Sequence, residues 1–226
     1  MRWTRCAVPL AALVVSLSGC TTVVAGKAIP GDAGGPDGLK SGDLSATLLS
    51  AEEINSLLGA EGIEVVESTE QLVDHSADIS DPACLGALYN AEEFIYDGSG
   101  WTELVDEILT QRVDDPDHWV EQTAVRFSSA DEAAEFYETS KSQWQECISR
   151  QVSVYDGDYE FTWEFDGLTV ADTTISQSAV QLDSEGWTCQ HAMSAVSDVI
   201  IEASACGLTL DDEAVTIVEA LAKNVG

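Results

Sequence analysis

Trp187 to Cys206 reads WTCQHAMSAVSDVIIEASAC, two runs rich in Val, Ile, Ala and Ser that meet at Ser197-Asp198. If these two residues form a two-residue turn, the flanking runs pair as an antiparallel hairpin in which Cys189 faces Cys206. Counted outward from the turn, this is a non-hydrogen-bonded pair, in which Cα atoms lie about 4.5 Å apart, a distance that suits a disulfide. The stretch therefore predicts a hairpin with a disulfide across its strands, although Ser-Asp is a poorer two-residue turn than Asn-Gly.

The N-terminus has the features of a secretory leader. Arg2 and Arg5 precede an apolar run over residues 7–17, which is too short to stay in a bilayer as a spanning helix. The run closes with Leu17-Ser-Gly-Cys20, which resembles the bacterial lipobox, where the cysteine receives a diacylglyceryl group; the alternative is an ordinary signal peptide with an incidental cysteine. We expect a signal peptide over residues 1–20, lipidation at Cys20, and a protein anchored by lipid on the outer face of the cell membrane.

Residues 21–46 are rich in Gly, Pro, Asp and Ser and are expected to form a flexible tether, followed by one domain over residues 47–226. No kinase sequence and no transmembrane segment occur after the leader, so we expect that any sensing passes through a partner or that the domain binds for another purpose.

Outside the cytoplasm disulfides are permitted. Cys6 lies in the leader and Cys20 is expected to carry lipid, which leaves four cysteines and three possible pairings. The hairpin selects Cys189–Cys206, and Cys84–Cys147 remains.

The chain is strongly acidic. It has 41 Asp and Glu, all after Cys20, and 7 of its 9 Lys and Arg lie there, so the part after Cys20 has a net charge close to −34. This charge repels nucleic acid and anionic lipid headgroups, so we expect no nucleic-acid partner and no membrane contact besides the lipid anchor. The acidity can indicate a cationic ligand, a metal or adaptation to salt, but the favoured explanation is a solvated, mutually repelling surface.

Helices are predicted where capping signals precede an apolar periodicity. The expected helices begin after Ser50, after Ser129 (extending to about Ile148) and after a cap at residues 209–212, and a helical turn is expected over residues 84–89.

Strands are predicted from alternation of apolar and polar residues. They are expected over residues 63–67, 94–96, 119–127, 152–154, 159–165 and 174–182, while 101–112 fits a helix or a strand. Residues 159–165 have one aromatic face, which either packs in the core or lines a cleft. The predicted class is α+β, a mostly antiparallel central sheet with flanking helices.

Several segments together resemble the PknH-like extracellular sensor domain family. They are Leu48-Leu-Ser-Ala-Glu-Glu-Ile-Asn55, Cys84-Leu-Gly, Gln122 with Val125-Arg-Phe127, Trp144-Gln-Glu-Cys147, Cys189-Gln-His-Ala192 and Ala205-Cys-Gly207. The family occurs at the outer end of an actinobacterial receptor kinase and in free lipoproteins. The resemblance implies two disulfides, first cysteine with second and third with fourth, and a deep cleft that holds an unidentified ligand.

Five residues are candidates for contact with that ligand. Gln122 and Trp144 belong to the family pattern, Trp163 lies on the aromatic strand face, and Gln190 and His191 lie in the stapled hairpin. For His191 the favoured interpretation is a packed side chain with satisfied nitrogens.

No pattern of catalysis or cofactor binding stands out. The three histidines lack zinc-ligand spacing, G-x-S-x-G does not occur, and the acid-rich turns lack the EF-hand frame. We therefore expect a non-enzyme without cofactor or metal. The leading hypothesis is a sensor-type domain that binds a small cell-envelope ligand, with an apolar ligand as one option; the alternative is a lipoprotein that docks on an envelope or kinase partner without using a pocket.

Overall fold

The computed structural model describes residues 43–114, 116–182 and 184–225. The expected signal peptide, Cys20 and residues 21–42 of the expected tether lie outside the described residues. Among the described residues no helix is long and apolar enough to cross a membrane. Leu44 and Thr47 are buried in the short 3-10 helix η1 (Leu44–Thr47). The core of the domain therefore includes Leu44, which precedes the expected start of the domain at Thr47.

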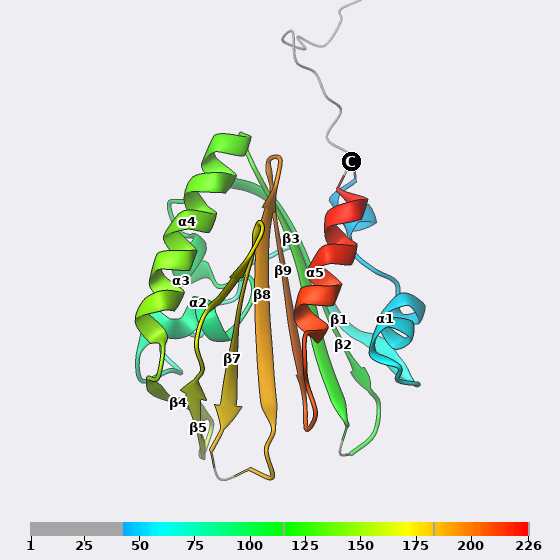
Figure 1. Cartoon of the computed structure of the whole chain (residues 1–226), viewed down its shortest axis with the longest axis vertical. Helices are drawn as coiled ribbons and strands as arrows, with labels where there is room; N and C mark the ends of the chain where they lie inside the picture. Colours follow the sequence, from blue (N-terminus) through cyan, green and yellow to red (C-terminus); the bar gives the residue numbers. More distant parts are fainter. Residues whose placement is uncertain (1–42, 115, 183, 226) are drawn as a thin grey trace, which may run out of the picture. The chain divides into compact units, whose positions relative to one another are not determined.

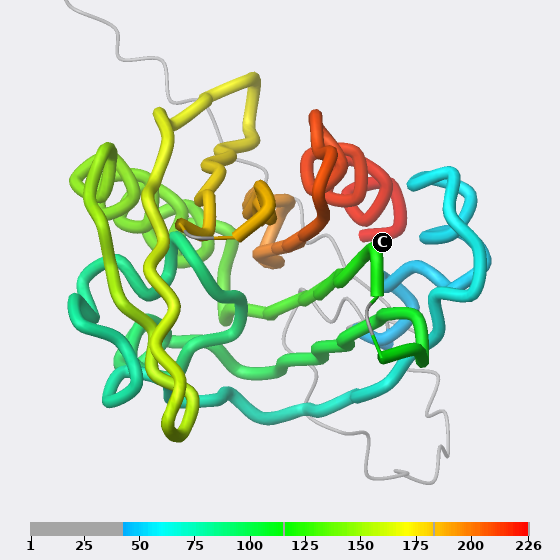
Figure 2. The backbone as a smooth tube through the Cα atoms, turned by 90° about the horizontal axis from the view of Figure 1, so that it is seen from below, coloured from blue at the N-terminus to red at the C-terminus, as the bar shows by residue number. Residues whose placement is uncertain are grey.

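One antiparallel sheet organises the described residues (Figure 1). Its strands follow the order β1-β2-β3-β9-β8-β7-β5-β4, and β6 pairs with β7. The bounds are β1 Ile63–Thr69, β2 Trp101–Gln111, β3 His118–Phe127, β4 Gln151–Asp156, β5 Tyr159–Phe165, β6 Thr169–Ala171, β7 Thr174–Gln181, β8 Thr188–Val196 and β9 Val199–Gly207. Figure 2 shows β1, β2 and β3, coloured cyan to green, as neighbouring strands. The predicted α+β class with a mostly antiparallel sheet is confirmed.

The stapled hairpin is confirmed in register and in linkage. Cys189 is the partner of Cys206 across β8 and β9, with Cα atoms 4.0 Å apart and a sulfur–sulfur bond between them. Ser197 makes the turn at a positive φ of 56°, which Ser-Asp provides less readily than Asn-Gly. The second disulfide joins Cys84 to Cys147, as the elimination and the family resemblance implied.

Helices cover both faces of the sheet. The bounds are α1 Ala51–Leu58, η2 Pro82–Cys84, α2 Leu85–Leu88, α3 Glu93–Tyr96, α4 Ala130–Cys147 and α5 Glu213–Asn224. Consecutive residues of β9 pack in different hydrophobic cores: Ile200 packs on the α4 side of the sheet and Ile201 on the α5 side. Figure 1 shows α4 and α5 on opposite sides of β8 and β9. We call the two faces the α4 face and the α5 face.

Two local predictions are wrong, and one open alternative is resolved. Residues 94–96, expected as a strand, belong to helix α3, which packs Tyr96 into the α4-side core. Residues 101–112, which fit a helix or a strand, are resolved as a strand: residues 101–111 form β2, and both edges of this strand pair with neighbours. The predicted side-chain cap at residues 209–212 is absent at the N-cap Asp212, and Gln190 Oε1 accepts the Ala214 backbone N–H instead (3.1 Å).

The aromatic face of β5 divides along the strand. Trp163 and Phe165 are buried in the α4-side core, whereas Tyr159 is 70% exposed at the hairpin end. The prediction that the aromatic face of β5 packs in the core therefore holds for Trp163 and Phe165 but not for Tyr159.

Candidate functional site

Two of the five residues predicted to contact ligand lie on the α5 face and hold the backbone of other segments. Gln122 exchanges two hydrogen bonds with Leu49, as donor to its carbonyl (2.7 Å) and acceptor from its N–H (2.9 Å). Gln190 donates to the Asp211 carbonyl (3.0 Å) while it accepts from Ala214. Both amides are thus satisfied by segments that cross the α5 face.

The other three lie on the α4 face. The rings of Trp144 and His191 are 4.5 Å apart between centroids, and His191 Nε2 lies 3.1 Å from Glu202 Oε2. Trp163 packs in the same core. The structure therefore brings Trp144 and His191 together, but none of the five lines the cavities described below. Their role in ligand contact stays a prediction.

The α4 face carries polar residues in register across neighbouring strands. One row runs from Glu67 through Ile108, Glu121 and Ser204 to His191 on β8. Strand alternation places such a row on one side of the sheet. His191 therefore shares its side with a group of acids that lie two to four strands away.

These acids border a cavity of about 250 Å³ between β1, β2, β3 and the segment that precedes α3. We call it the acidic cavity. Its lining residues are Glu67, Thr69, Val73, His75, Tyr89, Asn90, Ala91, Glu92, Asp106, Ile108, Trp119 and Glu121.

Three of its carboxyl groups are buried deep in the protein. Glu92, Asp106 and Glu121 are 1%, 4% and 8% exposed, respectively. Acidic side chains are rarely buried to this extent unless they are paired, because removal from water penalises the charged form. Such burial beside a cavity is a mark of functional sites.

A chain of hydrogen bonds fixes the floor of the cavity. The Ser204 hydroxyl donates to Asn90 Oδ1 (2.7 Å), Asn90 Nδ2 donates to Thr123 Oγ1 (3.1 Å), and Thr123 donates to Asp106 Oδ1 (2.5 Å). The chain connects β9, β3 and β2 with the segment between α2 and α3. The cavity floor is therefore a single connected polar unit.

Burial changes the acidity of two of these carboxyls. Desolvation raises the pKa of Asp106 to about 7, against the hydrogen bond from Thr123, and the charge of Glu202 adds to the rise. Desolvation, and then the charges of Asp106 and Glu202, raise the pKa of Glu121 well above its usual value, although the backbone N–H of Asn90 stabilises its charged form. At neutral pH these two groups thus retain protons that exposed acids have lost.

One side of the cavity contains an ion pair. His75 Nδ1 lies 2.6 Å from Glu92 Oε1, and the His75 backbone N–H donates to Glu92 Oε2 (3.0 Å). The hydrogen bond with Glu92 raises the pKa of His75. Both oxygens of Glu92 are therefore occupied, while Asp106 and Glu121 stay available to the cavity.

The acids do not form a metal site. No group of three or more His, Cys, Asp or Glu within the described ranges has the geometry to hold a metal ion. The arrangement can instead supply acceptors and negative charge to a small molecule, with the rings of Tyr89 and Trp119 beside them.

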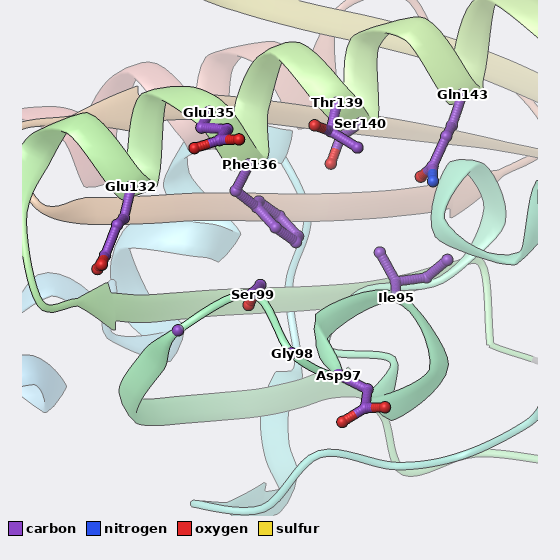
Figure 3. A pocket seen from close by; sticks show the side chains of 11 residues that line it. Ile95, Asp97, Gly98, Ser99, Glu132, Glu135, Phe136, Thr139, Ser140 and Gln143 are labelled. Carbon is purple, nitrogen blue, oxygen red and sulfur yellow. The ribbon is translucent and has the colours of Figure 1, made fainter.

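A second hollow, of about 420 Å³, lies between α4 and the turn after α3 (Figure 3). Figure 3 shows Phe136 extending from α4 into the space between Ser99 and Ile95, while Gln143 extends from α4 on the side of Ile95. The hydroxyls of Ser99 and Ser140 are buried in this region without a hydrogen-bond partner. Of the two glutamates at its border, Glu132 is half-buried and Glu135 is exposed. The hollow therefore lacks the buried carboxyl groups of the acidic cavity.

The sequence reasoning missed the acids of the cavity, because among 41 acids a pair of carboxylates has little weight. A signal exists nonetheless. Glu202 is the one charged residue within the run VIIEASAC. Asp106 and Glu121 each directly follow a valine, Val105 and Val120, but they lie in strands that contain other polar residues. An acid inside a strand whose neighbours are core residues indicates a carboxyl buried for a purpose.

Comparison with known proteins shows similarity to the extracellular part of a protein kinase. The family model described as "PknH-like extracellular domain" matches residues 39–224. The chain is 32% identical over 171 residues to the serine/threonine-protein kinases PknH of Mycobacterium bovis and Mycobacterium tuberculosis. The match covers 76% of this chain but only 29% and 27% of those kinases.

A solved structure agrees with the sequence match. The crystal structure of the extracellular domain of PknH from Mycobacterium tuberculosis has a TM-score of 0.78 and 31% sequence identity to this chain, and the alignment covers 80% of this chain and 94% of that one.

Proposed function

Because the chain belongs to the PknH-like extracellular domain family, we propose that it is a lipid-anchored, extracytoplasmic sensor-type domain that binds a small cell-envelope ligand in the acidic cavity. The leader, with Leu17-Ser-Gly-Cys20 at its end, supports the lipid anchor. The match to the extracellular part of PknH supports a position outside the cytoplasm.

The observation that carries the binding proposal is the acidic cavity itself. A cavity that combines aromatic walls with a few convergent polar groups of perturbed pKa is the usual form of a small-molecule site. Tyr89 and Trp119 supply the aromatic surface, and Asp106 and Glu121 supply the perturbed carboxyls. The hydrogen-bond chain from Ser204 to Asp106 holds the Asp106 carboxyl in place, so little ordering of this group is needed on binding.

The family match gives no reason to propose enzymatic activity for this chain. The matching region of the kinase is its extracellular domain, not its catalytic domain. Any signal from the bound ligand then passes to a partner protein.

Native mass spectrometry of the protein purified from its own host tests the proposal. We expect a co-purified small molecule that is lost from Ile108→Trp, because this change fills the cavity from β2. Val170→Trp adds the same indole at a side chain that is 55% exposed, outside the cavity, and should keep the molecule. An empty wild-type protein that cross-links reproducibly to one envelope protein would instead support the docking alternative.

A further inference from the structure

We propose that the acidic cavity selects an organic cation, an amine or guanidinium compound, whose charge lies between the carboxyls of Asp106 and Glu121 and whose carbon atoms contact Tyr89 and Trp119. This inference rests on the proposed function and adds the chemical class of the ligand.

The charges around the cavity favour a cation. Glu67, Glu92, Asp106 and Glu121 line it, and none of the lysines or arginines in the described part of the chain does. His75 is the one basic side chain among the lining residues, and Glu92 already pairs with it. An anionic ligand would meet Glu67 and the ionised fraction of Asp106 without a free basic group beside it, which disfavours binding.

Asp106 has unused capacity to accept a hydrogen bond. Oδ1 receives the Thr123 hydroxyl, and among the described residues no donor reaches the other oxygen. The side chain is 4% exposed and lines the cavity. A buried carboxylate that accepts one hydrogen bond is left with an incomplete set of partners. An ammonium or guanidinium group supplies several N–H donors and a compensating charge together.

The aromatic walls fit the same ligand class independently of the acids. Tyr89 and Trp119 come from different elements, the segment after α2 and β3, and both rings border the cavity. A cation over an aromatic face is attracted by the negative face of the ring, and the attraction is stronger when water is excluded. A neutral apolar ligand would gain from the rings but would leave the buried acids unpaired.

Cation binding is expected to depend on pH. A bound positive charge favours the ionised form of Asp106, whose pKa without ligand is about 7, so binding displaces a proton. Affinity is then strongest above pH 7 and falls as the pH drops through this pKa. We expect a loss of about tenfold or more between pH 7.5 and pH 5.5.

Three probes with four-carbon chains test the inference by calorimetry on the intact protein in phosphate buffer, which contains no amine. 1,4-Diaminobutane is a dication, 1,4-butanediol is neutral and succinate is an anion. We expect heat of binding from the diamine alone at pH 7.5. Asp106→Asn keeps the acceptor for Thr123 and should weaken diamine binding at least about tenfold. Glu160→Gln, the same charge change at an exposed position of β5, should leave it unchanged.

Equal binding of the three probes, or diamine binding that Asp106→Asn does not weaken, overturns the inference. Failure of the diamine to bind at all also overturns it. These results are distinguishable from failure of the proposed function, because a neutral or anionic molecule that co-purifies with the wild type and is lost from Ile108→Trp would retain the cavity as a binding site while excluding a cation as its ligand.

Discussion

Tyr96 on α3 donates its phenolic hydrogen to Oε1 of Glu202 on β9 across 2.5 Å, although the two residues are 106 positions apart in the sequence. Both side chains are buried, at 1% and 2% exposure. Desolvation and then the charge of Glu202 raise the pKa of Tyr96 well above its usual value, so Tyr96 remains a donor at all ordinary pH values. This bond attaches the short helix α3 to the middle of the sheet.

Tyr96→Phe should therefore destabilise the fold. It removes the donor and leaves a buried carboxyl with one partner fewer, which costs about 2 kcal/mol. Urea denaturation measures the change. Tyr155→Phe, at an exposed position of β4, is the control and should lie within about 0.5 kcal/mol of the wild type. A loss for Tyr96→Phe as small as that of the control would mean that the bond contributes little to stability.

The unliganded protein should lose stability as the pH rises from about 4 to 7. Asp106 and Glu121 have raised pKa values in the folded state, so the folded state binds more protons than the unfolded state in this window. Their contribution is complete below the unfolded pKa of about 4 and is lost as the pH rises through the folded pKa. The raised pKa of His75 acts in the same direction, over a higher pH window.

Urea titrations at several pH values, made without added ligand, check this pH dependence. We expect a slope of up to about 1.4 kcal/mol per pH unit from a single buried carboxyl. Asp106→Asn should reduce the slope. The difference in unfolding free energy between the variant and the wild type should therefore move in favour of the variant as the pH rises from 5 to 7. A wild-type protein whose stability rises steadily over the whole range would contradict the assignment of these groups as proton-retaining acids.

The two disulfides should differ in their contribution to stability. Cys189–Cys206 spans 17 residues and Cys84–Cys147 spans 63, so loop entropy assigns about 3 and about 4 kcal/mol to them. Paired Cys→Ala variants, one pair at a time, give the two values in guanidinium denaturation. Removal of the 84–147 bridge should cause the larger loss. The reverse order would indicate that strain or residual structure dominates over loop length.

Lipidation at Cys20 predicts that substitutions of Cys20 and Cys6 have different effects on membrane attachment. Cys20→Ala should release the protein from the membrane fraction, because the acyl chains provide the attachment and the acidic chain has no basic patch to replace them. Cys6→Ala should leave it there. Fractionation followed by immunoblotting measures both. Cys20→Ala that stays quantitatively in the membrane fraction would exclude the lipobox interpretation.

The sequence predicted best where a local pattern determines the structure. The capping box at Ser50, with its reciprocal bonds to Glu53, is present as expected, and the Cys189–Cys206 register follows from the turn position alone. Helix α4 ends at Cys147, one residue before the expected end. In each case neighbouring residues carry the information.

Prediction failed where a distant partner determines the outcome. Residues 94–96 have strand-like composition, but the bond from Tyr96 to Glu202 and the burial of Tyr96 hold them in α3. The strand β2 is recognisable only through its pairing with β1 and β3.

The candidate site was the least accessible from sequence, because its acids come from separate strands. The order β2-β3-β9-β8 brings Asp106, Glu121, Glu202 and His191 to one face of the sheet, and no local pattern specifies that order. Of these four, only His191 was selected from the sequence.

The alternation of β2 and β3 separates the cavity from the structural scaffold. Val105 and Val120 pack on the α5 face, while their next neighbours Asp106 and Glu121 face the cavity. A change of cavity chemistry therefore need not disturb the packing beneath it. In the proposed site, the side chains at positions 106 and 121 set the charge that a bound molecule meets. A redesign toward an anionic ligand would begin with basic residues at these two positions, while α5 and its core stay as they are.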